Sequence, residues 1–323
     1  MKSRKPDIFL GITMCMLVLA AVLCIVILFV QKNNESKETT EATQITTEAP
    51  KPSGNETLPP ITTEEIPTTE KPQTPVELAP INDAGLKAEL DESLRGLTSE
   101  WQVMVIDPAL GTKVGSAVNC GVDNWMTANR MAQVFIMGAV FQQAKDGTLV
   151  LEDVIEDVKS MITNNDTYAA DRLTERLGAG DSSKGREAVK SFAVSYGLKL
   201  GFNRSLSGTG GSQKNYVTAQ QTAELLGMIC SGLLVSEDAS QQMLDILLTP
   251  AEELEIDAGL ADDVKYGFVT DIESGTCICA MGVVRMPNRS FVISIVCNKP
   301  VTTEGAKKKL TELITLVAPY FKE

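Results

Sequence analysis

The pattern of apolar and polar positions divides the chain into three parts. Residues 8–30 form an unbroken, largely apolar run of 23 residues. Residues 31–80 contain few large apolar side chains, whereas residues 81–323 show helical and strand periodicities in turn. The pattern therefore predicts a membrane-spanning helix, an unfolded segment and a folded domain, in that order.

The apolar run is long enough to cross about 30 Å of hydrocarbon as a helix. Lys2, Arg4 and Lys5 precede it, and positive charge on this side predicts that residues 1–7 stay in the cytoplasm. A cleaved signal peptide is the alternative, but its apolar region is usually about 7 to 15 residues long and a small-x-small cleavage site is lacking. We expect a single-pass anchor in the cell membrane, with the rest of the chain extracellular.

Residues 31–80 are rich in Thr, Pro and Glu. Such a segment cannot bury enough apolar surface to offset the entropy lost on folding. We therefore expect a disordered extracellular stalk that carries the domain at residues 81–323 away from the membrane.

The domain begins with a helix and a pair of strands, continues with several helices, and ends with three strands and a last helix. This order favours an α+β fold, an α/β sandwich in which an antiparallel sheet is flanked by helices and interrupted by a helical insert. Helices are expected at residues 83–97, 131–141, 151–177 with a break, 185–196, 218–231, 236–248 and 303–321, and strands at residues 101–106, 113–114, 264–270, 275–284 and 290–298.

Composition narrows the function. The net charge is −13 and no basic stripe occurs, which argues against a nucleic-acid partner. The one basic cluster, residues 307–309, is expected on the solvated face of the last helix. Because the chain has no His, a typical zinc site is disfavoured, and we expect neither a metal nor a cofactor.

Several phrases of the domain occur in an order that resembles a known family. They are Met126 with residues 134–141, residues 161–171, 215–219, 240–247 and 258–265. In this order, and with this strand pattern, they resemble the class A β-lactamases and penicillin-binding transpeptidases over nearly all of residues 83–323. The resemblance implies the α+β fold described above and the chemistry of a serine hydrolase.

That chemistry depends on three motifs, Ser-x-x-Lys, Ser-Asp-Asn and Lys-Thr/Ser-Gly, and each is substituted here. The corresponding positions are Arg130 and Gln133 in the first motif, Asn165, Asp166 and Thr167 in the second, and Val269, Thr270 and Asp271 in the third. The first and second motifs lie 35 residues apart, which is shorter than in typical β-lactamases and suggests a trimmed loop beside the cleft.

These substitutions remove the reactive groups. Arg130 is always charged and cannot attack a carbonyl, and Gln133 has no titration with which to accept a proton. Asp166 is kept, and the resemblance implies a structural role for it. Residues 198–216, where the resemblance would place a deacylating Glu, contain no Asp or Glu.

Other routes to catalysis are weak. The absence of His excludes Ser-His-Asp and Cys-His arrangements, and no Gly-x-Ser-x-Gly elbow occurs. A shift of register would pair Thr127 with Arg130, but an Arg cannot act as the general base for a Thr at neutral pH. We therefore predict that the domain has no catalytic residues.

Two further features stay open. Arg130 and Asp271 either form an ion pair across the former active site or are two unconnected charges. The domain also holds five cysteines, and their odd number leaves at least one without an intramolecular partner. We expect small buried thiols, although pairing stays an alternative in an extracellular setting. The cysteines are Cys120, Cys230, Cys277, Cys279 and Cys297.

The leading hypothesis is a membrane-anchored extracellular pseudoenzyme that acts as a binding or regulatory module at the cell envelope. Its ligand would be a peptidoglycan peptide, a β-lactam-like compound or an envelope protein, and the candidate ligand-binding residues are Arg130, Asn165, Thr270 and Asp271. The alternative is an active β-lactamase or D,D-peptidase whose nucleophile lies elsewhere. A structural ectodomain without a ligand is a third class that the sequence does not separate from the first.

Overall fold

A computed structural model describes residues 78–127, 130–208, 213–249, 264–272 and 275–322. The chain divides into two compact units, Met1–Gln73 and Thr74–Glu323, and every described residue belongs to the second. The expected cytoplasmic tail, membrane helix and most of the stalk lie outside the described residues. Within the described ranges, no helix combines the length and apolar character needed to span a membrane.

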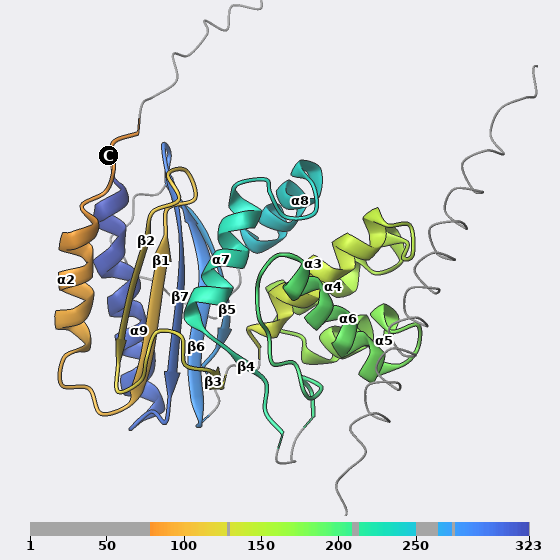
Figure 1. Ribbon diagram of the computed structural model, residues 1–323, viewed down its shortest axis with the longest axis horizontal. Helices are drawn as coiled ribbons and strands as arrows, with labels where there is room; N and C mark the ends of the chain where they lie inside the picture. Colours follow the sequence, from red (N-terminus) through yellow and green to blue (C-terminus); the bar gives the residue numbers. More distant parts are fainter. Residues whose placement is uncertain (1–77, 128–129, 209–212, 250–263, 273–274, 323) are drawn as a thin grey trace, which may run out of the picture. The chain divides into compact units, whose positions relative to one another are not determined.

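The second unit is built on a five-stranded antiparallel sheet with the order β2-β1-β7-β6-β5 (Figure 1). Nearly every residue of β6 and β7 is buried, because helices cover both faces of the sheet and leave no solvated side. The strands are β1 Glu100–Ile106, β2 Lys113–Val118, β5 Lys265–Asp271, β6 Cys277–Arg285 and β7 Ser290–Asn298.

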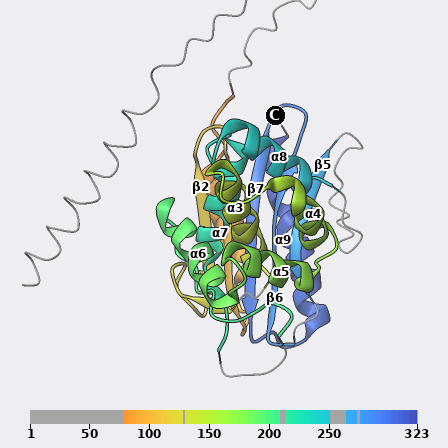
Figure 2. The same cartoon turned by 90° about the vertical axis from the view of Figure 1, so that its right-hand side faces the viewer.

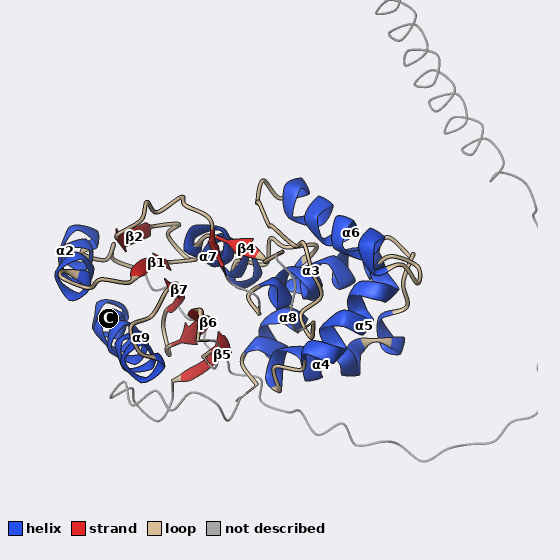
Figure 3. Cartoon of the chain, turned by 90° about the horizontal axis from the view of Figure 1, so that it is seen from below, coloured by secondary structure: helices blue, strands red, loops and turns tan. Residues whose placement is uncertain are grey.

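Helices α2 (Asp83–Leu94) and α9 (Thr303–Val317) cover one face of the sheet, as the view in Figure 3 shows. A short 3₁₀ helix, Ala318–Phe321, follows α9. Leu86, Leu90 and Leu94 of α2 are buried at a spacing of four residues, which places them on one side of the helix. Helix α2 ends three residues before the predicted boundary because Gly96 adopts a φ of 76°, a conformation that ends helices.

The other face of the sheet carries α7 (Ala219–Cys230) and, beyond it, the helical insert (Figures 1 and 2). Helix α3 is the core of the insert, since all of its residues from Ala132 to Phe141 are buried. The other elements of the insert are η1 Leu151–Asp153, α4 Ile155–Thr163, α5 Thr167–Leu177, α6 Ser182–Ser195 and α8 Glu237–Leu247.

A second, two-stranded sheet pairs β3 (Met126–Thr127) with β4 (Tyr216–Val217). Two-residue strands carry no alternation that a sequence pattern could reveal, and the sequence does not predict this pair. The predicted α+β fold, with its antiparallel sheet, flanking helices and helical insert, is otherwise confirmed.

Candidate functional site

The segment that leads into α3 is fastened to the sheet at Thr127. In the orientation of the Asn298 side-chain amide that satisfies both of its polar atoms, Asn298 accepts a hydrogen bond from Thr127 N and donates one to Thr127 O, each at 3.0 Å. The thiol of Cys277 also donates to Thr127 O, at 2.6 Å. The ends of β6 and β7 therefore fix the backbone just before Arg130.

Arg130 lies in the turn that precedes α3 (Ala132–Lys145), and Gln133 lies in the first turn of that helix. Gln133 N donates a hydrogen bond to Arg130 O at 3.0 Å, so the turn leads directly into the helix. Arg130 is partly exposed, whereas Gln133 is fully buried. Neither Nε2 nor Oε1 of Gln133 has a hydrogen-bond partner in the described part of the chain. Burying a polar group without a partner lowers the stability of a fold by roughly 1–3 kcal/mol.

The second set of predicted positions occupies the turn between α4 and α5. Asn165 has a φ of 56°, a left-handed conformation that Asn tolerates better than most residues. Its Nδ2 donates to Thr270 Oγ1 on β5 at 3.3 Å. The turn and β5 are thus brought together, as the resemblance implies for these two motifs.

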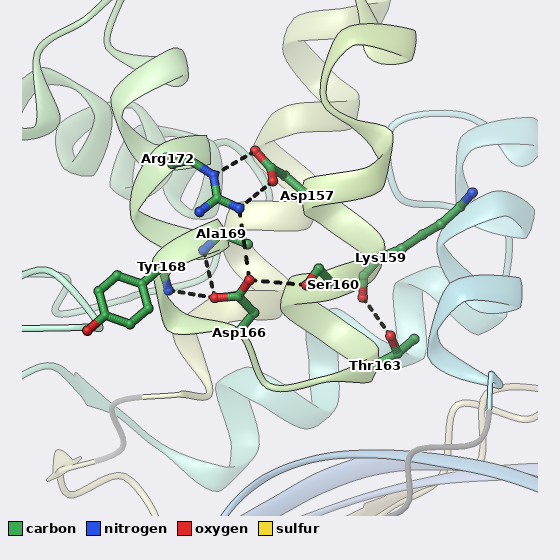
Figure 4. A network of polar contacts seen from close by, with 8 residues as sticks. All are labelled: Asp157, Lys159, Ser160, Thr163, Asp166, Tyr168, Ala169 and Arg172. Carbon is green, nitrogen blue, oxygen red and sulfur yellow. Dashed lines mark hydrogen bonds and ion pairs between the residues drawn. The ribbon is translucent and has the colours of Figure 1, made fainter.

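Asp166 is the N-cap of α5 (Figure 4). Its Oδ1 accepts hydrogen bonds from Tyr168 N at 2.9 Å and Ala169 N at 3.0 Å, and its Oδ2 accepts one from Ser160 Oγ at 3.1 Å. Burial raises the pKa of this carboxyl, but these hydrogen bonds and the charge of Arg172 outweigh burial, so the pKa lies below its usual value. Asp166 thus caps α5 and also joins it to α4 through Ser160, contacts that fit a structural role.

The third set of positions is buried on β5. Val269, Thr270 and Asp271 are 1%, 2% and 5% exposed, and Val269 belongs to the apolar core between the sheet and the insert. An apolar Val in this place supplies no charge to a ligand. Thr167, the last of the predicted positions, is the first residue of α5 and is partly exposed.

The ion pair suggested between Arg130 and Asp271 is not formed. Both residues are described, yet the ion pairs between described residues do not include one that joins them. Asp271 is buried at the end of β5, whereas Arg130 is partly exposed. Arg130 and Asp271 therefore do not pair with each other in the described part of the chain.

The thiols are free in all five described cysteines. Cys277, Cys279 and Cys297 are fully buried. A hydrogen bond with Cys277, burial and the negative charge of Asp271 raise the pKa of the Cys279 thiol well above its usual value. A protonated, buried thiol such as that of Cys279 is a poor nucleophile. The prediction of small buried thiols is confirmed for Cys277, Cys279 and Cys297, whereas Cys120 and Cys230 are partly exposed.

Two polar residues that the sequence did not assign hold the loop beside the site. Asp171 accepts hydrogen bonds from Leu206 N at 2.8 Å, from Ser207 N at 3.1 Å and from the Ser207 hydroxyl. The Oδ1 of Asn215, which is fully buried, accepts from the backbone amides of Asn203 and Arg204. Asp171 lies on α5 between the buried residues Ala170 and Leu173. A carboxylate in such a place needs hydrogen-bond donors, and this requirement could have pointed to Asp171 in the sequence.

Comparisons with known proteins agree with this architecture. A model of the beta-lactamase enzyme family matches residues 156–318, half of the chain. The chain belongs to this family. No curated protein matches the sequence.

Solved class A β-lactamases share the fold. The class A β-lactamase of the last common ancestor of Gram-negative bacteria is 21% identical in sequence and has a TM-score of 0.60. The match covers 73% of this chain and 98% of the ancestral protein. A β-lactamase from Xanthomonas campestris is 16% identical with a TM-score of 0.61, over 74% of this chain and 98% of that one. Such identities support a common fold and leave the activity of this chain to be argued from its own residues.

Proposed function

We propose that this chain is a membrane-anchored, extracellular pseudoenzyme of the β-lactamase family that binds a ligand or protein partner at the cell envelope. The observation that carries the proposal is the pair Arg130 and Gln133 at the start of α3. Acyl transfer needs a nucleophile and a base within hydrogen-bond reach of each other. A guanidinium and a buried neutral amide supply neither group.

The surrounding residues also have other roles. Asp166 caps α5, Asp171 holds the loop at Leu206 and Ser207, and the nearby Cys277 thiol is buried and bonded to Thr127 O. Residues 198–216 provide no carboxylate that could activate water for deacylation. The scaffold is kept while the reacting groups are replaced, which favours binding over turnover.

The polar groups that remain define what the former cleft offers to a ligand. Arg130 contributes a partly exposed positive charge, and Asn165 and Thr270 contribute neutral donors and acceptors. This set suits a polar ligand such as a peptidoglycan peptide, a β-lactam-like compound or a polar segment of an envelope protein. None of these groups forms a covalent bond with such a ligand at neutral pH.

The test is intact-mass analysis of the full chain after incubation with a reactive penicillin and, separately, with a fluorophosphonate. We expect no adduct under conditions that fully label an active class A β-lactamase. An adduct mapped to one residue would instead support the alternative, an active β-lactamase or D,D-peptidase, and would identify its nucleophile.

A thermal-shift experiment with the same penicillin and with a peptidoglycan stem peptide tests the binding role. A rise in melting temperature without an adduct is expected for a ligand of the former cleft. Arg130→Ala should abolish that rise, whereas Arg176→Ala, which removes an exposed charge on α5, should leave it intact. The absence of any shift would direct the search to protein partners.

The anchor is proposed from the sequence of residues 8–30 alone. Deleting residues 1–30 should move the protein from the membrane fraction to the soluble fraction. Protease added to intact cells should cleave the stalk of the full chain. Protection of the stalk, or an unchanged distribution of the deletion variant, would contradict the proposed topology.

A further inference from the structure

A second concave region lies at the far end of the sheet from Thr127. This region, called the turn pocket, has a volume of about 520 Å³ and lies between the β1–β2 turn, the end of α7 and the β6–β7 turn, residues Arg285–Ser290. Strand β6 runs from Cys277, which contacts Thr127, to Arg285, which lines the pocket. At roughly 3.3 Å per residue, the two regions are about 26 Å apart.

The lining of the turn pocket is positively charged. Arg285 and Arg289 contribute to it, and no Asp or Glu of the described residues does. Arg289 is 6% exposed and its charge is matched by an ion pair with the buried Asp107. Arg285 is exposed and forms no ion pair with a residue of the described ranges. The pocket therefore contains one guanidinium that has no acidic partner among the described residues.

A further cation adjoins Arg285. Lys265 at the start of β5 is the direct cross-strand partner of Arg285, so the two side chains leave the same face of the sheet. Like charges in this position are destabilising, by some tenths of a kcal/mol. Lys265 is exposed and, like Arg285, has no ion pair within the described part of the chain. An anion that lies between the two side chains would relieve their repulsion.

Neutral groups complete the pocket. Asn288, Ser231 and Ser290 line it, and the Ser231 hydroxyl donates to Pro108 O at 3.1 Å. Burial raises the pKa of the Cys230 thiol to about 12, although the charge of Arg285 opposes the rise, so this thiol stays neutral and does not compensate Arg285. The pocket thus combines unpaired positive charge with hydrogen-bond donors, as phosphate-binding sites do.

We propose that the turn pocket binds a phosphate group through Arg285 and Lys265, with Asn288 and Ser290 as neutral partners. Two adjacent cations match the charge of about −1.5 to −2 on a phosphate near neutral pH better than that of a carboxylate. The net charge of −13 does not oppose this locally, because charges beyond about 8–10 Å are largely screened at physiological salt. The proposal is independent of the function proposed for the former cleft.

The test is calorimetric titration of the full chain with inorganic phosphate at fixed ionic strength, with chloride and acetate as reference anions. We expect saturable binding of phosphate, and an affinity for chloride and acetate that is at least about tenfold lower. In Arg285→Met the affinity for phosphate should fall by about tenfold or more. Lys265→Met should weaken binding in the same direction. Lys308→Met, which removes an exposed charge on α9, should leave it unchanged.

Two results would overturn the proposal. One is binding of chloride or acetate with an affinity equal to that of phosphate, which would indicate that the pocket does not select a phosphate group. The other is unchanged phosphate affinity in both Arg285→Met and Arg285→Lys, provided that each variant keeps the melting temperature of the unmodified chain. Titration with glycerol 3-phosphate shows whether the natural ligand is a phosphate ester or free phosphate. An affinity equal to that for inorganic phosphate indicates an ester on an envelope molecule, and a much lower affinity indicates free phosphate.

Discussion

The Nδ2 of Asn165 donates a hydrogen bond to Thr270 Oγ1 at 3.3 Å and so joins the α4–α5 turn to strand β5. In the serine hydrolases that the chain resembles, these two motifs hold groups that move protons and bind substrate. An amide and a hydroxyl do not titrate near neutral pH. The contact between these two motif positions is therefore a hydrogen bond between neutral groups that joins two parts of the fold.

The first prediction concerns the buried amide of Gln133. Replacing it with Met keeps the approximate shape of the side chain and removes two buried polar atoms that lack partners among the described residues. Gln133→Met should therefore stabilise the domain by about 1 kcal/mol, a rise in melting temperature of about 2–4 °C for a domain of this size. Thermal denaturation of the full chain at pH 7 measures the effect.

Gln102 is the matched control. It is equally buried, but its Nε2 donates to Gly121 O at 2.7 Å and to Asn124 O at 2.8 Å, and its Oε1 accepts from Ala219 N at 3.0 Å. Gln102→Met should lower stability by about 1–3 kcal/mol, because it leaves these buried groups unpaired. Equal losses in both variants would mean that Gln133 is hydrogen-bonded in solution, for example to an internal water.

The periodicity of the sequence was enough to predict the layered fold. The strands of the main sheet and the helices at its faces are long, and their apolar residues repeat with the period of each element. The predicted break in residues 151–177 corresponds to the turn at Asn165 between α4 and α5. Local pattern thus accounts for the outer helices α2 and α9, which bury one face, and for β6 and β7, which are buried on both faces and read as continuous apolar runs.

The details of the site depend on long-range contacts that a single sequence does not encode locally. Thr127 is fixed by Asn298, 171 positions away in the chain, and Asp171 by the loop at Leu206. The sequence suggested an ion pair between Arg130 and Asp271, but opposite charges near one cleft do not show which way each side chain points. Substitution of the motifs could be recognised from the sequence, whereas the contacts that replace them required the structure.

A second prediction tests Asp171 as the anchor of the loop at residues 201–208. Asp171→Ala removes the acceptor of the backbone amides of Leu206 and Ser207 and of the Ser207 hydroxyl. Hydrogen exchange at those two amides should become at least about tenfold faster, because each charge-assisted hydrogen bond contributes roughly 1.5–3 kcal/mol. Glu175→Ala, an exposed acid on the same helix, should leave the exchange rates unchanged. Unaltered exchange in Asp171→Ala would show that other contacts hold the loop.

A third prediction concerns restoration of the reactive pair. Arg130→Ser combined with Gln133→Lys rebuilds the Ser-x-x-Lys sequence across the turn before α3 and the first turn of α3. We expect no multiple-turnover hydrolysis of a chromogenic cephalosporin, because Asn165 cannot shuttle a proton and residues 198–216 contain no acid to activate water. A steady rate above that of the parent chain would show that these two substitutions alone account for the loss of activity. Intact mass, recorded in parallel, reveals any acyl adduct that forms and persists.

The last prediction concerns the dependence of stability on pH. The pKa of the Asp166 carboxyl lies below its usual value of 3.8, since the hydrogen bonds at the start of α5 outweigh the opposing effect of burial. A depressed pKa in the folded state stabilises the fold fully above the unfolded pKa, and this contribution is lost as the pH falls through the folded pKa. At pH 7, Asp166→Ala should cost about 1–2 kcal/mol, the usual effect of removing an N-cap.

The melting temperatures of the parent chain and Asp166→Ala should therefore differ most above about pH 5 and converge as the pH falls below the unfolded value. Asp166→Asn should recover most of the loss at pH 7, because Asn is also a good N-cap, and its stability should not depend on this titration. Asp123→Ala, which changes an exposed carboxyl in a loop, serves as the control for net charge. A difference between the parent and Asp166→Ala that stays constant down to pH 2 would contradict the assignment, because it would show that the stabilisation does not come from the ionised carboxylate.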